Sequence, residues 1–344
     1  MTVKVPQQRQ RAYQAQLRKV DALAISDAND RDLPSAFQEL LKQAPSRADG
    51  VEVQLRMAFQ LALAPDQENK RRAAALYQQI FLDQHVQPIQ RVYAILGRLQ
   101  LSEIIHDATL TQGLLSCANR LASSGDVRKR ATTVNDAVQQ LLEVADQLYP
   151  TALVKFQLAS WYGERLMEGS VSTAEREASL RALQQNTQQG EALIPEALKY
   201  AVRWETVNLF WWDGRVRRLC AALTGETYEA AERAFERALY LMVLEPSDTL
   251  PAYDALVRVR LSFAAMLAEA YGVNRQQDIV HLLEPVCEVL IKSAGEPLLF
   301  NEWLRHPNDL LAADLTRLSA LDPDFANALH RQQDATATRV KSQP

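Results

Sequence analysis

A chain of 344 residues is too long for a single small hydrophobic core, so it favours either two subdomains or one elongated stack. Its 47% hydrophobic and 23% charged residues exclude a disordered chain, and its 11 glycines are few for a protein rich in hairpins or phosphate-binding loops. The net charge of −4 argues against a dedicated nucleic-acid-binding protein, which needs a surplus of basic residues.

The N-terminal residues are polar and contain no apolar core of a signal peptide, so we expect none. No segment has the ~20 apolar residues that a membrane-spanning helix requires. The three cysteines, Cys117, Cys220 and Cys287, are far apart and lack metal-ligand spacing, which predicts buried, reduced thiols. We therefore expect a cytoplasmic protein without a bound cofactor.

Helical periodicity of apolar residues extends through nearly the whole chain, and prolines interrupt it at intervals of about one helix. One predicted helix spans Asp136–Tyr149 and ends at Pro150. Ser172 and Glu175 have the spacing of a capping box, which predicts the start of a glutamine-rich helix that continues to about Gln189. Because this second helix has few apolar residues, we expect it to lie on the outside. The inward face of the Asp136–Tyr149 helix comprises Val138, Leu141, Leu142, Ala145 and Leu148.

The clearest periodicity predicts a helix over Tyr228–Leu244, with Glu229 and Arg233 as an i, i+4 pair on its outer side. Farther along, Pro285 lies inside an apolar run and is expected to break or kink a helix there. The inward face of the Tyr228–Leu244 helix comprises Tyr228, Ala231, Phe235, Ala238, Leu239 and Met242.

No segment alternates polar and apolar residues as a half-buried strand does, so we predict no β-sheet. Short connections between many helices predict an all-α array of antiparallel helix pairs over residues 1–330. A subdivision near 124–130 or near 169–173 is an open alternative. The polar last segment, 331–344, is expected to form a disordered tail.

Two short patterns recur within the predicted helices. Leu158–Gly163 and Leu267–Gly272 share the pattern L-A-x-x-Y-G. The second pattern consists of an alanine, an aromatic residue four positions later, an apolar residue three positions after that, and a proline fifteen residues after the alanine. It occurs as Ala73, Tyr77, Ile80 and Pro88, and again as Ala231, Phe235, Ala238 and Pro246. These patterns resemble tetratricopeptide (TPR) repeats. The resemblance implies a right-handed solenoid of helix pairs whose groove binds a protein or peptide and has no chemistry of its own.

The segment Trp204–Arg218 combines aromatic residues with arginines. We expect Trp204 and Trp211 to enter the core, Trp212 to be the exposed ring, and Gly214 to end the helix. One interpretation is that the tryptophans anchor adjacent helices while the arginines are solvated or cap the helix end. The other is a partner-binding patch, because Trp and Arg are common in binding hot spots. That patch comprises Trp212, Arg215, Arg217 and Arg218.

Two acid–histidine pairs have the i, i+3 spacing found in helical di-iron proteins: Glu103 with His106, and Asp278 with His281. A di-iron site also needs two further inward-facing carboxylates, and none is evident by position. Chance pairs, with His106 and His281 as surface or partly buried histidines, explain this spacing better than a metal site. The pairs nevertheless define an alternative hypothesis, an all-α helix-bundle enzyme with a metal site.

Asn135, Asp136 and Glu143 resemble part of the magnesium motif of isoprenoid cyclases, although Gln139 replaces its hydroxyl ligand. Helix capping by Asn135 explains the same residues more simply. We therefore expect a non-enzymatic scaffold or adaptor that binds a protein or peptide partner. A regulator that contacts nucleic acid through Arg215–Arg218 is a third hypothesis, which the acidic net charge disfavours.

Overall fold

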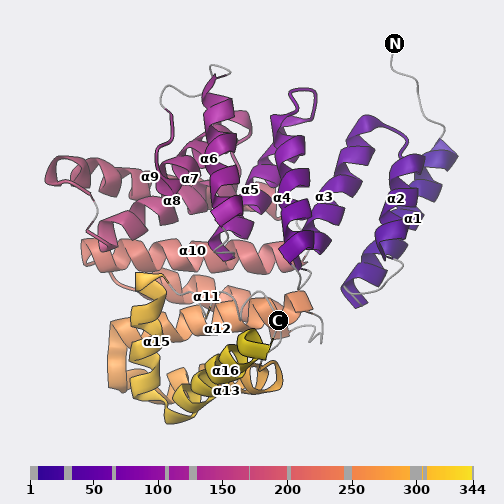
Figure 1. The fold of residues 1–344 in the computed structure, drawn as a ribbon. Helices are drawn as coiled ribbons and strands as arrows, with labels where there is room; N and C mark the ends of the chain where they lie inside the picture. Colours follow the sequence, from indigo (N-terminus) through magenta and orange to yellow (C-terminus); the bar gives the residue numbers. More distant parts are fainter. Residues whose placement is uncertain are drawn as a thin grey trace. The chain divides into compact units, whose positions relative to one another are not determined.

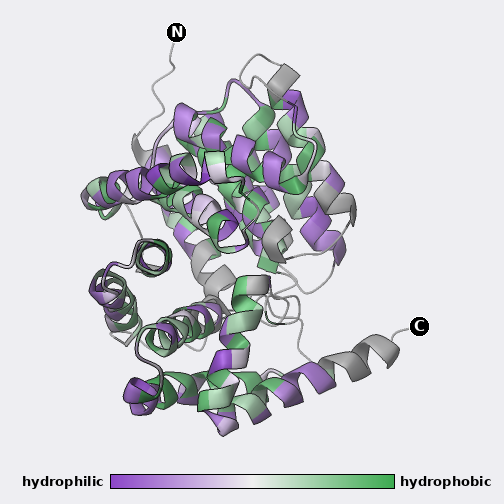
Figure 2. Ribbon diagram, turned by 90° about the vertical axis from the view of Figure 1, so that its left-hand side faces the viewer, coloured by the Kyte–Doolittle hydropathy of each residue, from purple (hydrophilic) through white to green (hydrophobic). Residues whose placement is uncertain are grey.

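The computed structural model describes residues 7–26, 33–63, 67–104, 108–123, 130–169, 171–199, 203–243, 250–294, 304 and 308–342. Within these residues every regular element is a helix and no strand occurs, which confirms the all-α prediction (Figure 1). Hydrophobic and hydrophilic residues lie side by side on most helices, as expected of amphipathic helices that pack on one another (Figure 2). None of the helices in the described part is long and apolar enough to cross a membrane.

The chain divides into two units, Met1–Tyr149 and Pro150–Pro344. The boundary falls at the proline that was expected to end a helix, whereas the sequence suggested a subdivision near 124–130 or 169–173. Pro150 lies between the helices α7 and α8, where its missing N–H costs no helical hydrogen bond.

In the first unit, each helix contacts the next one along the chain, and α3, α5 and α7 also contact one another in series. Side chains bridge these alternate helices: the Tyr13 hydroxyl of α1 donates to the Asp49 carbonyl of α3 over 3.2 Å, and Gln90 of α5 donates to the Ala48 carbonyl of α3 over 2.9 Å. This pattern is a sequential stack of antiparallel helix pairs. The helices are α1 (Gln7–Ser26), α2 (Leu33–Gln43), α3 (Arg47–Leu63), α4 (Gln67–Leu82), α5 (Pro88–Ile104), α6 (Ala108–Ser123) and α7 (Val134–Leu148).

The second unit is assembled around one helix, α10, which contacts α8, α9, α11 and α12. Its C-terminal helices α13, α15 and α16 pack on one another, and α15 also packs on α12. The elements are α8 (Ala152–Met167), α9 (Thr173–Ala197), α10 (Arg203–Thr224), α11 (Glu229–Val243), α12 (Leu250–Tyr271), the 3₁₀ helix η1 (Gly272–Arg275), α13 (Gln276–Lys292), α15 (Asp309–Leu321) and α16 (Pro323–Ser342).

The helix pairs are longer than TPR units. Their first helices begin at Gln7, Arg47, Pro88 and Val134 in the first unit and at Ala152, Arg203 and Leu250 in the second. Within each unit, successive first helices begin 40 to 51 residues apart, more than the 34 residues of a TPR repeat. The shared L-A-x-x-Y-G pattern also serves two different purposes. Gly163 lies in the middle of α8 against Leu219, whereas Gly272 has φ +54° and ends α12.

The predicted helix boundaries agree closely with the structure at α7 and α11, whereas α9 begins where predicted but continues to Ala197, eight residues past Gln189. The capping box of α9 is present, with the Ser172 N–H donating to Glu175 over 3.4 Å, and α9 buries only four residues, as expected of an outer helix. At α7 the cap is Thr133, not Asn135: the Asp136 N–H donates to the Thr133 hydroxyl over 3.1 Å. The carboxylate of Asp136 in turn accepts from the Thr133 N–H over 3.0 Å.

The C-terminal third differs from the sequence prediction at two points. Helix α13 continues through Pro285, so the expected break does not occur there, whereas a kink at this residue stays a prediction. Helix α16 continues to Ser342, past residue 331 where a disordered tail was expected, and Gln332 is 1% exposed. Tertiary packing of α16 on α13 and α15 supplies stability that its polar sequence does not indicate.

Aromatic rings packed on helical glycines join three helix pairs. Tyr77 of α4 packs on Gly97 of α5, Phe156 of α8 on Gly190 of α9, and Phe235 of α11 on Gly214 of α10. A Cβ atom at each glycine would lie 2.5–2.8 Å from a ring carbon, closer than real contacts allow. The missing side chains therefore set how closely these helices approach.

Gly214→Ala should destabilise the protein by about 1–3 kcal/mol, because the new methyl group overlaps the buried Phe235 ring. The matched control is Gly50→Ala in α3, where a Cβ atom would meet its nearest neighbours at 3.6 and 3.7 Å. That control should be neutral or slightly stabilising. Urea denaturation measures both variants, and equal stability of Gly214→Ala and the wild type would contradict the packing argument.

The Thr133–Asp136 cap predicts a pH dependence of stability. Hydrogen bonds from the hydroxyl and N–H of Thr132, with the N–H of Thr133, lower the pKa of Asp136 to about 2. Since an unfolded aspartate titrates near 3.9, ionised Asp136 stabilises the fold at neutral pH, and this contribution is lost as the pH falls from about 5 toward 2. Asp136→Asn should therefore be less stable than the wild type at pH 7 and approach it near pH 2. A stability difference that is constant over this range would refute the assignment.

Candidate functional site

Helix α10 does not end at Gly214 but continues through it to Thr224, so the predicted stop is wrong. Glycine lowers helix propensity, yet here its missing side chain accommodates the Phe235 ring, and this packing outweighs the local preference. The expectation that Trp212 is the exposed ring is also wrong, because its side chain is 6% exposed. Trp211 is buried as expected, and the side chain of Trp204 lies outside the described residues.

Arg215 connects α10 to α8. Its guanidinium donates to the Glu164 carboxylate over 2.6 Å and lies 5.6 and 5.2 Å from the ring centres of Trp211 and Trp212. The Trp211 indole N–H donates to the Ser262 hydroxyl of α12 over 2.9 Å. The predicted aromatic–arginine segment therefore joins three neighbouring helices.

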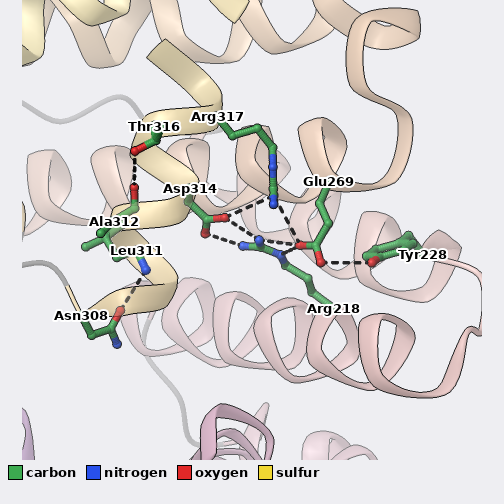
Figure 3. A network of polar contacts seen from close by, with 9 residues as sticks. All are labelled: Arg218, Tyr228, Glu269, Asn308, Leu311, Ala312, Asp314, Thr316 and Arg317. Atoms are coloured by element: carbon green, nitrogen blue, oxygen red, sulfur yellow. Dashed lines mark hydrogen bonds and ion pairs between the residues drawn. The ribbon is translucent and has the colours of Figure 1, made fainter. Parts of the chain in front are cut away.

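Arg218 is the centre of a buried polar network (Figure 3). Its two terminal nitrogens donate to both carboxylate oxygens of Asp314 in α15 over 2.6 and 2.7 Å, and its Nε donates to Glu269 of α12 over 2.6 Å. The Tyr228 hydroxyl donates to Glu269 over 3.2 Å, and Arg317 lies 3.5 Å from Asp314.

The pKa values of Arg218 and Tyr228 keep both side chains protonated, as their roles as hydrogen-bond donors require. Burial lowers the pKa of Arg218, but the hydrogen bonds and charges of Asp314 and Glu269 outweigh it and raise the pKa overall. Burial and then Glu269 raise the pKa of Tyr228 to about 12, so its hydroxyl is a donor at neutral pH. Arg218 is thus a charged donor that the network pairs internally with two carboxyl groups.

Arg217 connects α10 to α9. Its Nε donates to Asp213 over 2.7 Å, and a terminal nitrogen lies 2.9 Å from Glu191 of α9. Burial raises the pKa of Asp213, and Arg217 opposes that shift. The three predicted site arginines therefore each join α10 to a different set of helices, and partner binding by Trp212 and these arginines stays a prediction.

The sequence contained a signal for these contacts that the pattern analysis missed. Three contacts between alternate helices join residues 51 positions apart: Glu164 with Arg215, Trp211 with Ser262, and Arg218 with Glu269. The same spacing relates Trp161-x-Gly163 to Trp212-x-Gly214. Helices α8, α10 and α12 therefore stack with corresponding positions facing one another. An alignment of the sequence with itself, shifted by 51 residues, would have indicated Glu164 and Glu269 as the partners of Arg215 and Arg218. It would not have indicated Asp314.

A groove opens on the other side of α10. Helices α9 and α11 make little direct contact, and α10 forms the floor between them. Two open cavities of about 270 and 380 Å³ adjoin here and share Arg233 and Arg237 of α11. We name this feature the α9–α11 groove; its lining comprises Glu191, Ile194, Pro195, Phe210, Asp213, Arg217, Ala230, Arg233, Ala234, Glu236, Arg237, Tyr240 and Leu241.

One row of α11 side chains faces solvent along this groove: Arg233, Arg237 and Tyr240, the last 65% exposed. Arg233 makes only a 3.6 Å contact with Glu229, in which both side chains are more than 60% exposed. The Arg237 guanidinium lies 5.8 Å from the centre of the Phe210 ring, and its positive charge acts on the Asp213 carboxylate, although none of the ion pairs between described residues includes Arg237. The exposed aromatic–arginine combination therefore lies on α11.

Of the two acid–histidine pairs, the structure describes the side chains of Asp278 and His281. Asp278 forms an ion pair with Arg275, and His281 is exposed on α13. The side chains of Glu103 and His106 lie outside the described residues. Over the part of the chain with placed side chains, no three His, Cys, Asp or Glu residues converge in a metal-binding arrangement.

The cyclase-like residues are engaged in local contacts of α7. Asp136 belongs to the capping box, and Glu143 accepts a hydrogen bond from Gln139 over 2.8 Å. Of the three thiols, Cys117 and Cys220 are buried as predicted, and burial raises the pKa of each. Cys287 is only partly buried.

Comparison of the sequence with models of known protein families gave no match, and comparison with curated proteins gave none either. The case for a function therefore depends on the geometry of the groove and of α10.

Asp314→Leu should destabilise the protein by about 3–5 kcal/mol, because it deprives a buried guanidinium of its bidentate partner. The control is Glu288→Ala, which removes the exposed 3.4 Å pair with Lys292 and should cost less than about 0.5 kcal/mol. Adding Arg218→Met to Asp314→Leu should recover part of the loss. Urea denaturation of the four proteins measures these differences, and similar small effects of both single changes would contradict the assigned role of Arg218.

Proposed function

We propose that this protein is a non-enzymatic scaffold, a TPR-like solenoid of helix pairs that binds a protein or peptide partner in the α9–α11 groove. The observation that carries the proposal is the exposed row of Arg233, Arg237 and Tyr240 beside the apolar side chains of Phe210 and Leu241. Arginine and aromatic residues are the side chains most often found in binding hot spots. An exposed tyrosine adds contact area at a low entropic cost.

The packing of the helices supports the solenoid part of the proposal. In the first unit, helices contact their neighbours and their next-but-one neighbours, and in the second unit α8, α10 and α12 repeat this arrangement. In such stacks, successive helices contribute side chains to one extended surface, so binding needs no single diagnostic residue. The groove is formed in this way, from residues of α9, α10 and α11.

The shape of the groove supports the choice of a macromolecular partner. The two adjoining cavities are open to solvent and elongated along α11, whereas small-molecule sites usually enclose most of the ligand surface. The other cavity near the predicted site residues, beside Arg218 and Asp314, has a volume of only about 40 Å³. That space suits a buried water molecule better than a substrate.

A photo-crosslinking amino acid at position 240 should capture a specific partner in the cells from which the protein comes. The same amino acid at position 181, on an exposed part of α9 where Arg181 pairs with Glu177, serves as the control. We expect an adduct from position 240 that is absent from position 181 and is weakened by Arg237→Glu. Identical adducts from both positions, or adducts from position 181 alone, would contradict a partner in the groove.

A further inference from the structure

The arginines along the α9–α11 groove differ in how many hydrogen bonds and ion pairs they form within the protein. Arg217 is saturated, because Asp213 and Glu191 hold it at 2.7 and 2.9 Å. Among the described residues, Arg233 has one long, exposed contact with Glu229, and Arg237 lies over the face of Phe210 and attracts the Asp213 carboxylate without forming an ion pair with it. Two neighbouring guanidiniums therefore keep most of their N–H donors for groups outside the chain.

Arg233 and Arg237 are one helical turn apart, which places their Cβ atoms about 5–6 Å from each other. In an extended peptide, side chains two residues apart point the same way and are separated by about 6.4–6.8 Å. A peptide with carboxylates at alternate positions therefore matches the spacing of the two guanidiniums. Each guanidinium can take one carboxylate in a bidentate arrangement.

The groove next to these arginines is apolar. Phe210 lies beneath the Arg237 guanidinium, and Tyr240 and Leu241 continue the lining along α11. A bulky apolar residue placed after the acidic pair would reach this part of the groove and cover the exposed Tyr240 ring.

Resting on the proposed function, we propose that the partner presents an extended acidic segment with two carboxylates at alternate positions, followed by a large apolar residue. The carboxylates bind Arg233 and Arg237, and the apolar side chain packs on Tyr240. The groove also contains the exposed Glu236, and both this charge and the net charge of −4 disfavour the continuous phosphate backbone of a nucleic acid. Two discrete carboxylates need only reach the two guanidiniums, so charge complementarity favours a peptide.

The test uses fluorescence anisotropy with the full chain and a labelled eight-residue peptide that contains Glu-Ser-Glu followed by Leu. Replacing both glutamates of the peptide with glutamine should weaken binding at least tenfold, since charge-assisted hydrogen bonds are lost. Arg237→Gln in the protein should weaken binding of the acidic peptide about tenfold, and Tyr240→Ser should also weaken it. The control Arg181→Gln should leave binding unchanged. All three protein positions are exposed, so circular dichroism should show intact helices.

The outcomes separate this inference from the proposed function. If the acidic and the glutamine peptide bind equally well, or Arg237→Gln has no effect, the acidic-segment inference is refuted. If crosslinking from position 240 still captures a groove-bound partner in that case, the proposed function stands. Tighter binding of a single-stranded thymidine oligonucleotide than of the acidic peptide, abolished by Arg237→Gln, would overturn the choice of a peptide. A preference for Glu-Ser-Glu over a peptide with adjacent glutamates would support the proposed spacing.

Discussion

The architecture of the second unit depends on the burial of Arg218 between two carboxylates. A guanidinium without partners would be very costly at that depth, so α12 and α15 must supply Glu269 and Asp314 in the required positions. This requirement fixes α10 relative to both helices. Arg215 and Arg217 connect the same helix to α8 and α9 in an analogous way. A row of arginines that looks like a surface patch in the sequence is therefore the set of cross-links within the unit.

The position of α10 also explains why a groove exists. One side of this helix is covered by α8 and α12, and the other faces the interval between α9 and α11. Because α9 and α11 make little contact, Asp213 and Phe210 of α10 lie at the bottom of this interval, where the side chains of Arg217 and Arg237 cover them. Arg217 neutralises Asp213, so the floor of the groove adds no unpaired negative charge. What remains available to a partner is the exposed row on α11.

The sequence predicted those features that depend on local order. Periodicity identified α7 and α11 to within about two residues, and the spacing of Ser172 and Glu175 identified the start of α9. Local rules failed where a distant residue decides the outcome. Gly214 resembles a helix stop, but Phe235 needs its missing side chain. Trp212 was assigned to the outer side of an amphipathic helix, whereas a helix with four neighbours is buried on most sides. Asp314 is 96 residues from Arg218, and no local pattern connects them.

The most direct test of the central claim, that a partner occupies the α9–α11 groove, is amide hydrogen exchange of the full chain with and without saturating acidic peptide. The account predicts slower exchange confined to residues 229–243 and the C-terminal half of α9, with the first unit unchanged. Slower exchange that is absent from α9 and α11 and appears elsewhere in the chain would contradict it.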